Sequence, residues 1–227
     1  MNGGIRSLIT VLRTYLDLRL TKDFWKMNSI YIQYNGRRLK ILFLDGLSML
    51  EEIFIDEIYN CKVKHQPIIV DIGANVGFYS IWAGCNYKNP RINVDENHMN
   101  IKIYKKAVGG KAGKDTIYLS YASGLSSLTQ RSDYDSEEVE VITLKDVFEQ
   151  NNLKKIDILK IDTEGSEYNI LSKAEQLLGK IHNILLEYHS RDDLEKLLTL
   201  FKKNNFEVVR ADDGHIGIII TKNRTYG

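Results

Sequence analysis

Short apolar runs alternate with amphipathic segments along most of the chain. The runs at 68–70, 156–161 and 183–188 each predict a buried strand, because continuous apolar stretches bounded by polar residues are typical of strands in parallel sheets. Between and after them, apolar residues recur at helical spacing, as in 167–178 and 192–204. Strands separated by helices predict an α/β fold built on a mostly parallel sheet.

Other patterns predict elements at the two ends of the chain. Strand-like segments at 29–33 and 39–44 flank Asn35-Gly36, a strong hairpin signal. Two more, at 206–210 and 216–221, flank Asp212-Asp213-Gly214 and predict an antiparallel strand at the edge of the sheet.

Two further segments predict a helix and a strand. Ser48 with Glu51 forms a capping box that predicts a helix from Ser48 to about residue 60. A strand is expected at 101–104, before a segment beginning at Lys106.

The first residues predict an amphipathic helix over 5–20. It could pack on the domain, form a homodimer contact or lie on a membrane surface, although its mixed charges argue against an anionic lipid surface. We therefore divide the chain into a cap of helix and hairpin at 1–60 and a main domain at 61–227.

The most informative local pattern is the turn after the first parallel strand, VDIGANVGFYS at 70–80. Gly73 and Gly77 allow positive φ angles and a close ligand approach, and the following helix N-terminus faces the same crevice. Asn75 stands where a dinucleotide fingerprint has its middle glycine, and no G-x-x-x-x-G-K-[ST] motif is present. The pattern is instead similar to the first motif of class I S-adenosylmethionine (SAM) methyltransferases.

Together with four other segments, this motif resembles the FkbM family of methyltransferases. The segments are KAVGGKAG at 106–113, VEVITLKDV at 139–147, DILKIDTEGSEYNIL at 157–171 and LLEYH at 185–189. The resemblance implies a Rossmann-like class I sheet, a SAM cofactor and O-methylation, often of sugars or polyketide-type products.

The resemblance and the strand ends together suggest a cofactor site. Its expected residues are Asp71, Gly73, Ala74, Asn75, Gly77, Phe78, Ala107 and Val108. Asp71 is expected either to accept backbone amides of the turn or to meet the methionine ammonium through water. The segment at 106–109 is expected to follow a strand and to border the adenine.

The catalytic candidates are Lys160, Asp162, Glu164 and His189. Asp162 or Glu164 could accept a hydroxyl proton, and Lys160 should share a strand face with Asp162 and pair with it or acidify a hydroxyl. Glu187 and His189 end the next strand, so both could approach the acceptor.

Simpler roles remain open for these residues. The acids from Asp162 to Glu167 could cap a helix N-terminus, and His189 could be a structural, hydrogen-bonded histidine. Asp162 and Glu164 could instead hold a divalent metal together, but no spaced His and Asp cluster stands out, so we assign no metal ligands and leave metal dependence open.

Composition limits the remaining alternatives. A net charge of +1 with mixed charges gives no sign of a nucleic-acid groove. Cys61 and Cys85 lack metal spacing and are expected to be reduced thiols. No 18-residue apolar run predicts a transmembrane helix and the start is a poor signal peptide, so a cytoplasmic protein is expected.

The region around 85–100 is shorter than the family pattern requires. A second parallel strand ending in a ribose-binding acid needs about five residues, and its crossover helix needs about a dozen or more on its own. Both do not fit in the available residues 84–100. We expect a truncation or missing residues there.

The leading hypothesis is a SAM-dependent O-methyltransferase for a hydroxyl of a small molecule, sugar or glycan. The alternatives are an RNA or protein methyltransferase, or a methyltransferase-like interaction module without a cofactor. The short region at 85–100 is the main support for the interaction module.

Overall fold

The computed structural model describes residues 29–34, 37–42, 46–63, 66–75, 77–87, 101–118 and 136–226. The strands are β1 (Ser29–Tyr34), β2 (Arg37–Leu42), β3 (Ile69–Ile72), β4 (Ala107–Val108), β5 (Gly113–Tyr118), β6 (Ser136–Ile142), β7 (Ile156–Ile161), β8 (Ile181–Tyr188), β9 (Phe206–Ala211) and β10 (Gly217–Asn223). The helices are α2 (Gly46–Leu50), η2 (Glu51–Ile55), α3 (Phe78–Asn86), α4 (Leu144–Gln150), α5 (Glu167–Lys173), α6 (Glu175–Leu178), α7 (Arg191–Lys203) and η4 (Arg224–Tyr226).

The main sheet has five strands in the order β3-β7-β8-β10-β9. β3, β7 and β8 are parallel, and β10 runs antiparallel to both of its neighbours. The predicted α/β fold with a parallel core and an antiparallel C-terminal hairpin is confirmed. The placement of the antiparallel strand was wrong, because β10 lies inside the sheet and β9 forms the edge. β10 is the more apolar of the two strands, and the inner position buries it on both faces.

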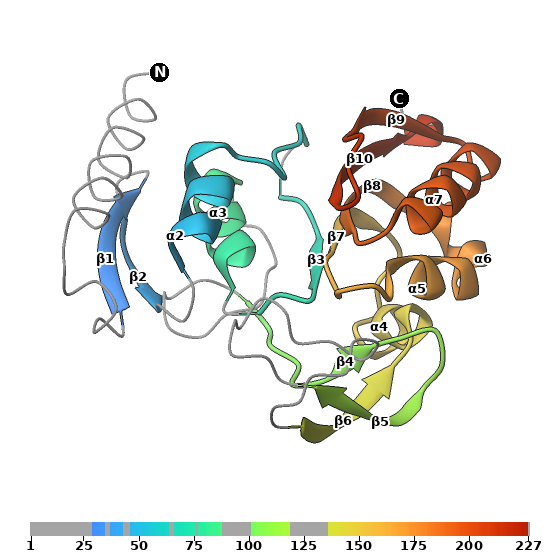
Figure 1. Ribbon diagram of the computed structural model, residues 1–227, viewed down its shortest axis with the longest axis horizontal. Helices are drawn as coiled ribbons and strands as arrows, with labels where there is room; N and C mark the ends of the chain where they lie inside the picture. The colour runs from blue at the N-terminus through green and yellow to red at the C-terminus, as the bar shows by residue number, and fades with distance from the viewer. Residues whose placement is uncertain are drawn as a thin grey trace.

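Helices cover both faces of this sheet (Figure 1). Leu185 of β8 belongs to one hydrophobic cluster with Tyr79 and Trp82 of α3. Ile184 and Leu186, its neighbours in β8, belong to a second cluster that includes residues of α5 and α7. Successive strand residues therefore face opposite layers, which explains why the central strands read as continuous apolar runs.

A small sheet of three strands, in the order β4-β6-β5, lies beside the main one (Figure 1). The predicted strand at 101–104 was wrong, since 101–106 has no regular structure. The expectation that the segment at 106–109 follows a strand falls with it: Ala107 and Val108 themselves form β4, which pairs with β6. Among the described residues no strand lies beyond β3 in the main sheet, so 101–104 has no ladder to join.

The N-terminal hairpin is confirmed, with β1 antiparallel to β2, while its Asn35-Gly36 turn and the helix expected at 5–20 lie outside the described residues. The helix cap predicted at Ser48 was wrong, because α2 begins at Gly46 and continues into the wide π-helical turn η2. Tyr34 and Leu39 of the hairpin share a buried cluster with Phe54 and Trp82. The hairpin thus packs on the layer that contains α3.

Two smaller predictions concern the thiols and the membrane. Cys61 and Cys85 are free, as expected, and burial raises the pKa of each to about 11. In the part of the chain that the structure describes, no helix is long and apolar enough to cross a bilayer.

Candidate functional site

The turn between β3 and α3 is held in an unusual backbone conformation. Gly73, Asn75 and Gly77 have φ angles of 74°, 49° and 86°. The amide of Gly77 donates a 2.7 Å hydrogen bond to the carbonyl of Ala74, which closes the turn. A Cβ on Gly73 would collide with the carbonyl oxygen of Asp162. Glycine therefore lets this turn pack directly against the end of β7.

Asp71 lies under the turn and contacts side chains. Its Oδ2 accepts a 2.7 Å hydrogen bond from the hydroxyl of Ser80, and its Oδ1 lies 3.5 Å from the Lys160 ammonium. Among the described residues no backbone amide of the turn donates to Asp71, and the Ser80 hydroxyl occupies one of its oxygens. Oδ1 is buried and has no hydrogen-bond partner among the described residues.

Lys160 joins the turn to the end of the neighbouring strand. Its ammonium donates hydrogen bonds to the carbonyl of Gly73 and to Asp162 Oδ2, each 3.2 Å long. Burial opposes its charge, but Asp162 and Asp71 together raise the pKa of Lys160 above its ordinary value. The predicted pairing with Asp162 is confirmed, and Lys160 is a fixed cation between two carboxylates.

The loop after β7 is organised from within by Glu167. This side chain is fully buried and accepts hydrogen bonds from the amide and hydroxyl of Thr163, at 2.8 and 3.0 Å, and from the amide of Gly165, at 3.2 Å. Glu164 adopts a left-handed φ of 56° within this loop. The helix-capping role considered for the acids therefore suits Glu167, which satisfies the amides preceding α5, whereas Asp162 and Glu164 are only partly buried.

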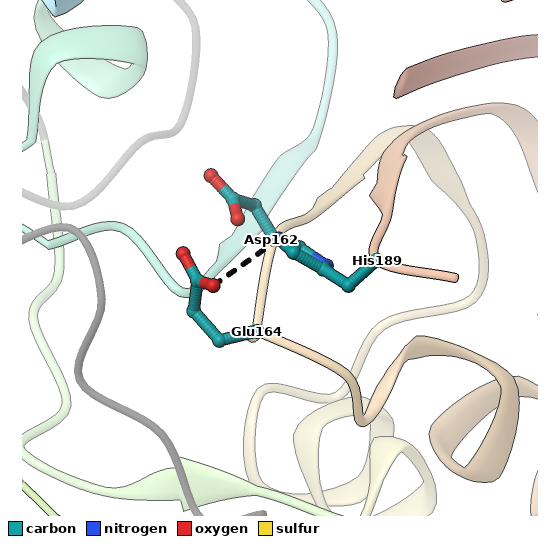
Figure 2. Close-up of side chains that lie close together, drawn as sticks. All are labelled: Asp162, Glu164 and His189. Carbon is teal, nitrogen blue, oxygen red and sulfur yellow. Dashed lines mark ion pairs between the residues drawn. The ribbon is translucent and has the colours of Figure 1, made fainter. Parts of the chain in front are cut away.

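His189 follows β8 and reaches the same loop, as Figure 2 shows. Its Nε2 lies 3.3 Å from Glu164 Oε2, and its Nδ1 lies 3.3 Å from Glu167 Oε1. Burial opposes protonation, but Glu167 and Glu164 raise the pKa of His189 to about 9. The neighbouring carboxylates therefore favour the protonated imidazole, and the role of His189 as a base stays a prediction.

A small cavity of about 30 Å³ lies between the turn and the strand ends. Its lining includes Ala74 and Phe78 from the turn and helix, Lys160, Asp162 and Glu187 from the strands, and Glu52 and Tyr59 from the η2 region. Two candidates from the turn and helix thus meet two candidates from the strand end at this cavity: Ala74 and Phe78, and Lys160 and Asp162. Phe78 is mostly a core side chain, since it is buried and packs edge-on against Phe54.

Three acidic side chains line this cavity beside mostly apolar and aromatic ones: Glu52, Asp162 and Glu187. Burial and the neighbouring Asp162 raise the pKa of Glu187 to about 7, and burial and Asp162 also raise the pKa of Glu52. The Tyr59 hydroxyl donates a 3.3 Å hydrogen bond to Glu187. Glu52 and Tyr59 did not emerge from the sequence, because the segment before residue 60 carries no recognisable motif; only packing brings it here.

Two expected cofactor residues lie elsewhere. Ala107 and Val108 form β4 in the small sheet and do not line the cavity. A place for them beside the adenine stays a prediction. The segment expected to be short continues from Tyr87 into 88–100, which lie outside the described residues.

Comparisons with known proteins complete the description. A family model described as "Methyltransferase FkbM domain" matches residues 60–208. The chain is 23% identical to a 31-O-demethyl-FK506 methyltransferase FkbM of Streptomyces tacrolimicus, over 73% of this chain and 83% of that protein. It is also 23% identical to Methyltransferase 1 of Beauveria bassiana, over 84% of this chain and 89% of that protein.

Two matches are more limited. The antimetabolite synthetase AmbE of Pseudomonas aeruginosa is 21% identical over 78% of this chain, which corresponds to 11% of that synthetase. Among solved structures, Trm5b of Pyrococcus abyssi matches 86% of this chain and 56% of its own at 13% identity, with a TM-score of 0.36. That score is too low to support an argument about fold or substrate.

Proposed function

We propose, from the premise that this chain belongs to the FkbM methyltransferase family, that it is a SAM-dependent O-methyltransferase. Its acceptor would be a hydroxyl of a small molecule, sugar or glycan. The Streptomyces relative is named as a 31-O-demethyl-FK506 methyltransferase, which supports an oxygen acceptor.

One observation carries the proposal: the cavity beside the glycine turn is lined by acids. Glu52, Asp162 and Glu187 face it, with Lys160 as the cation among its lining residues. SAM has a sulfonium and an ammonium, so an acidic cavity suits its methionine end. The buried Oδ1 of Asp71 accepts no hydrogen bond from the described residues, although the Lys160 ammonium lies 3.5 Å away. It lies under the same turn and is a further acceptor for that end. A volume of about 30 Å³ suits a methyl-sulfonium, while the rest of the cofactor would lie along the exposed turn.

The cofactor supplies an activated methyl group on a cationic sulfur. The chain then has to orient the acceptor and receive its hydroxyl proton. Glu187 is the best placed base, because its pKa of about 7 lets it be ionised at neutral pH and still accept a proton. Lys160 holds Asp162 beside the cavity through a hydrogen bond, and His189 lies 3.3 Å from Glu164 and holds it in place.

The experiment is a calorimetric titration of the purified chain with SAM and, separately, with S-adenosylhomocysteine, which lacks the sulfonium charge. SAM should bind more tightly, and Glu187→Gln should weaken SAM by about tenfold while changing S-adenosylhomocysteine little. Asp213→Asn, an exposed carboxylate outside the cavity lining, is the matched control.

A folded chain that binds neither compound would reject the proposal and favour the interaction module. If Glu187→Gln loses the same affinity for both compounds, the SAM cofactor is retained, but recognition of the sulfonium charge by the cavity is rejected.

A further inference from the structure

Asp162, Glu164 and His189 converge at the carboxyl ends of β7 and β8. Each offers one ligand atom, and these atoms all lie within 4.8 Å of one another. In Figure 2 the imidazole reaches toward the two carboxylates from the adjacent chain segment. Ile161 and Leu186 are paired across the two parallel strands, so the residues that follow these strand ends meet by topology.

The groups behind these residues fix how the imidazole faces. Fully buried Glu167 lies 3.3 Å from Nδ1 of His189, while Nε2 points toward Glu164. A carboxylate behind one imidazole nitrogen orients the other nitrogen toward a metal in many metal sites. Glu167 also accepts hydrogen bonds from Thr163 and Gly165, so the loop that bears Glu164 is fixed by the same side chain.

The balance of charge also favours a bound cation. Asp162, Glu164 and Glu167 surround one imidazole, and all three are at least four-fifths buried by side-chain exposure. Lys160 is shared between Asp162 and Asp71 and compensates only part of this charge. Buried carboxylates in excess are costly unless a cation or protons compensate them.

We propose that Asp162, Glu164 and His189 bind a divalent transition-metal cation, which takes the place of the Nε2 proton of His189 beside Glu164. Two carboxylates with one imidazole suit the series from Mn²⁺ to Zn²⁺, since oxygen ligands favour Mn²⁺ and imidazole favours the later metals. Three protein ligands leave positions for water or a substrate oxygen. Asp162 also lines the cavity, so the cation would lie where an acceptor hydroxyl arrives. This last role rests on the proposed function, whereas cation binding does not.

The test uses Mn²⁺ as the probe. It is added to the purified 227-residue chain after treatment with a chelator. Calorimetry and electron paramagnetic resonance should show one Mn²⁺ per chain. Glu164→Gln should weaken binding at least tenfold, and Glu167→Gln should weaken it about 10- to 100-fold, because Glu167 positions His189 and the loop that bears Glu164. Asp213→Asn removes an exposed carboxylate and should leave binding unchanged. Circular dichroism establishes that each variant is folded.

The outcomes separate the two proposals. Absence of Mn²⁺ binding, or equal affinity in wild type and folded Glu164→Gln, overturns the metal site. SAM binding in chelator alongside either result leaves the proposed function in place. Mn²⁺ binding without any SAM binding keeps the metal site and rejects the methyltransferase proposal.

Discussion

Two loops meet at the site, and they use different chemistry at the same kind of position. The turn after β3 and the loop after β7 both follow parallel strands, precede helices and contain left-handed residues, including Asn75 and Glu164. The turn is built from small residues, and its shape depends on a close approach to Asp162. The loop is acidic, and its shape depends on one buried side chain, Glu167.

The difference indicates that the turn after β3 and the loop after β7 have separate roles at the site. A turn without large side chains presents backbone and leaves room for a ligand, whereas the acidic loop presents fixed carboxylates and an oriented imidazole. Lys160 links them, because it contacts Gly73 in one and Asp162 in the other. Steric changes should therefore damage the turn, and charge changes should damage the loop.

The largest expected effect comes from Gly73→Ala. The new Cβ would collide with the backbone of Asp162 at a φ of 74°, so unfolding by urea should show a loss of about 3 kcal/mol or more. Gly179→Ala is the matched control, since its Cβ would meet nothing within 4 Å. Equal stability of the two variants would contradict the tight packing of the turn.

A smaller effect on stability is expected from the charges of the loop after β7. The free energy of unfolding is measured against pH in the presence of a chelator. The pKa of His189 in the folded chain, about 9, lies above the ordinary 6.5. The contribution of His189 to the free energy of unfolding is therefore complete below pH 6.5 and is lost as the pH rises to 9. The change should be on the order of 2 kcal/mol. Glu167→Gln should move the pKa of His189, read from its NMR titration, back toward 6.5 and flatten this part of the stability curve.

Glu149→Gln, an exposed acid on α4, should leave that titration unchanged. A His189 pKa that stays near 9 in Glu167→Gln would show that the loop does not depend on this buried carboxylate.

The smallest effect on stability is expected at Asn75, which is exposed with a φ of 49°. Asn75→Ala should cost about 1 kcal/mol, because asparagine tolerates left-handed backbone better than alanine, and it should weaken SAM binding. Asn75→Gly should keep both stability and binding if the turn acts through its backbone. Loss of SAM binding in Asn75→Gly, seen by calorimetry, would instead assign the contact to the side chain.

The elements of the C-terminal half were well predicted from the sequence. The bounds of β7 match the apolar run at 156–161, and the pattern of 192–204 is α7 within a residue at each end. These segments are buried on one or two faces, so their periodicity is strong. The segments at 48–60 and 101–104 were poorly predicted, because a π turn and the lack of a strand partner are not visible in local patterns.

The site was predicted in part. Gly73, Lys160 and Asp162 were expected together and lie together. Asp71 contacts the Ser80 hydroxyl, whereas contacts with backbone amides had been expected. His189 had been considered as a base, and neighbouring carboxylates raise its pKa and favour its protonated form. Glu167 was expected only near a helix end, and its contact with His189 depends on the packing of β7 beside β8.

The sequence by itself determined the α/β alternation, the glycine turn, and the acids at strand ends, since each is a local pattern with a local physical cause. Tertiary structure alone decided which of these groups face one another. It brought Glu52 and Tyr59 from the N-terminal region onto Glu187 and Asp162. It also set the charges of His189 and Glu187, because burial and neighbouring carboxylates fix a pKa only once distant segments have packed together.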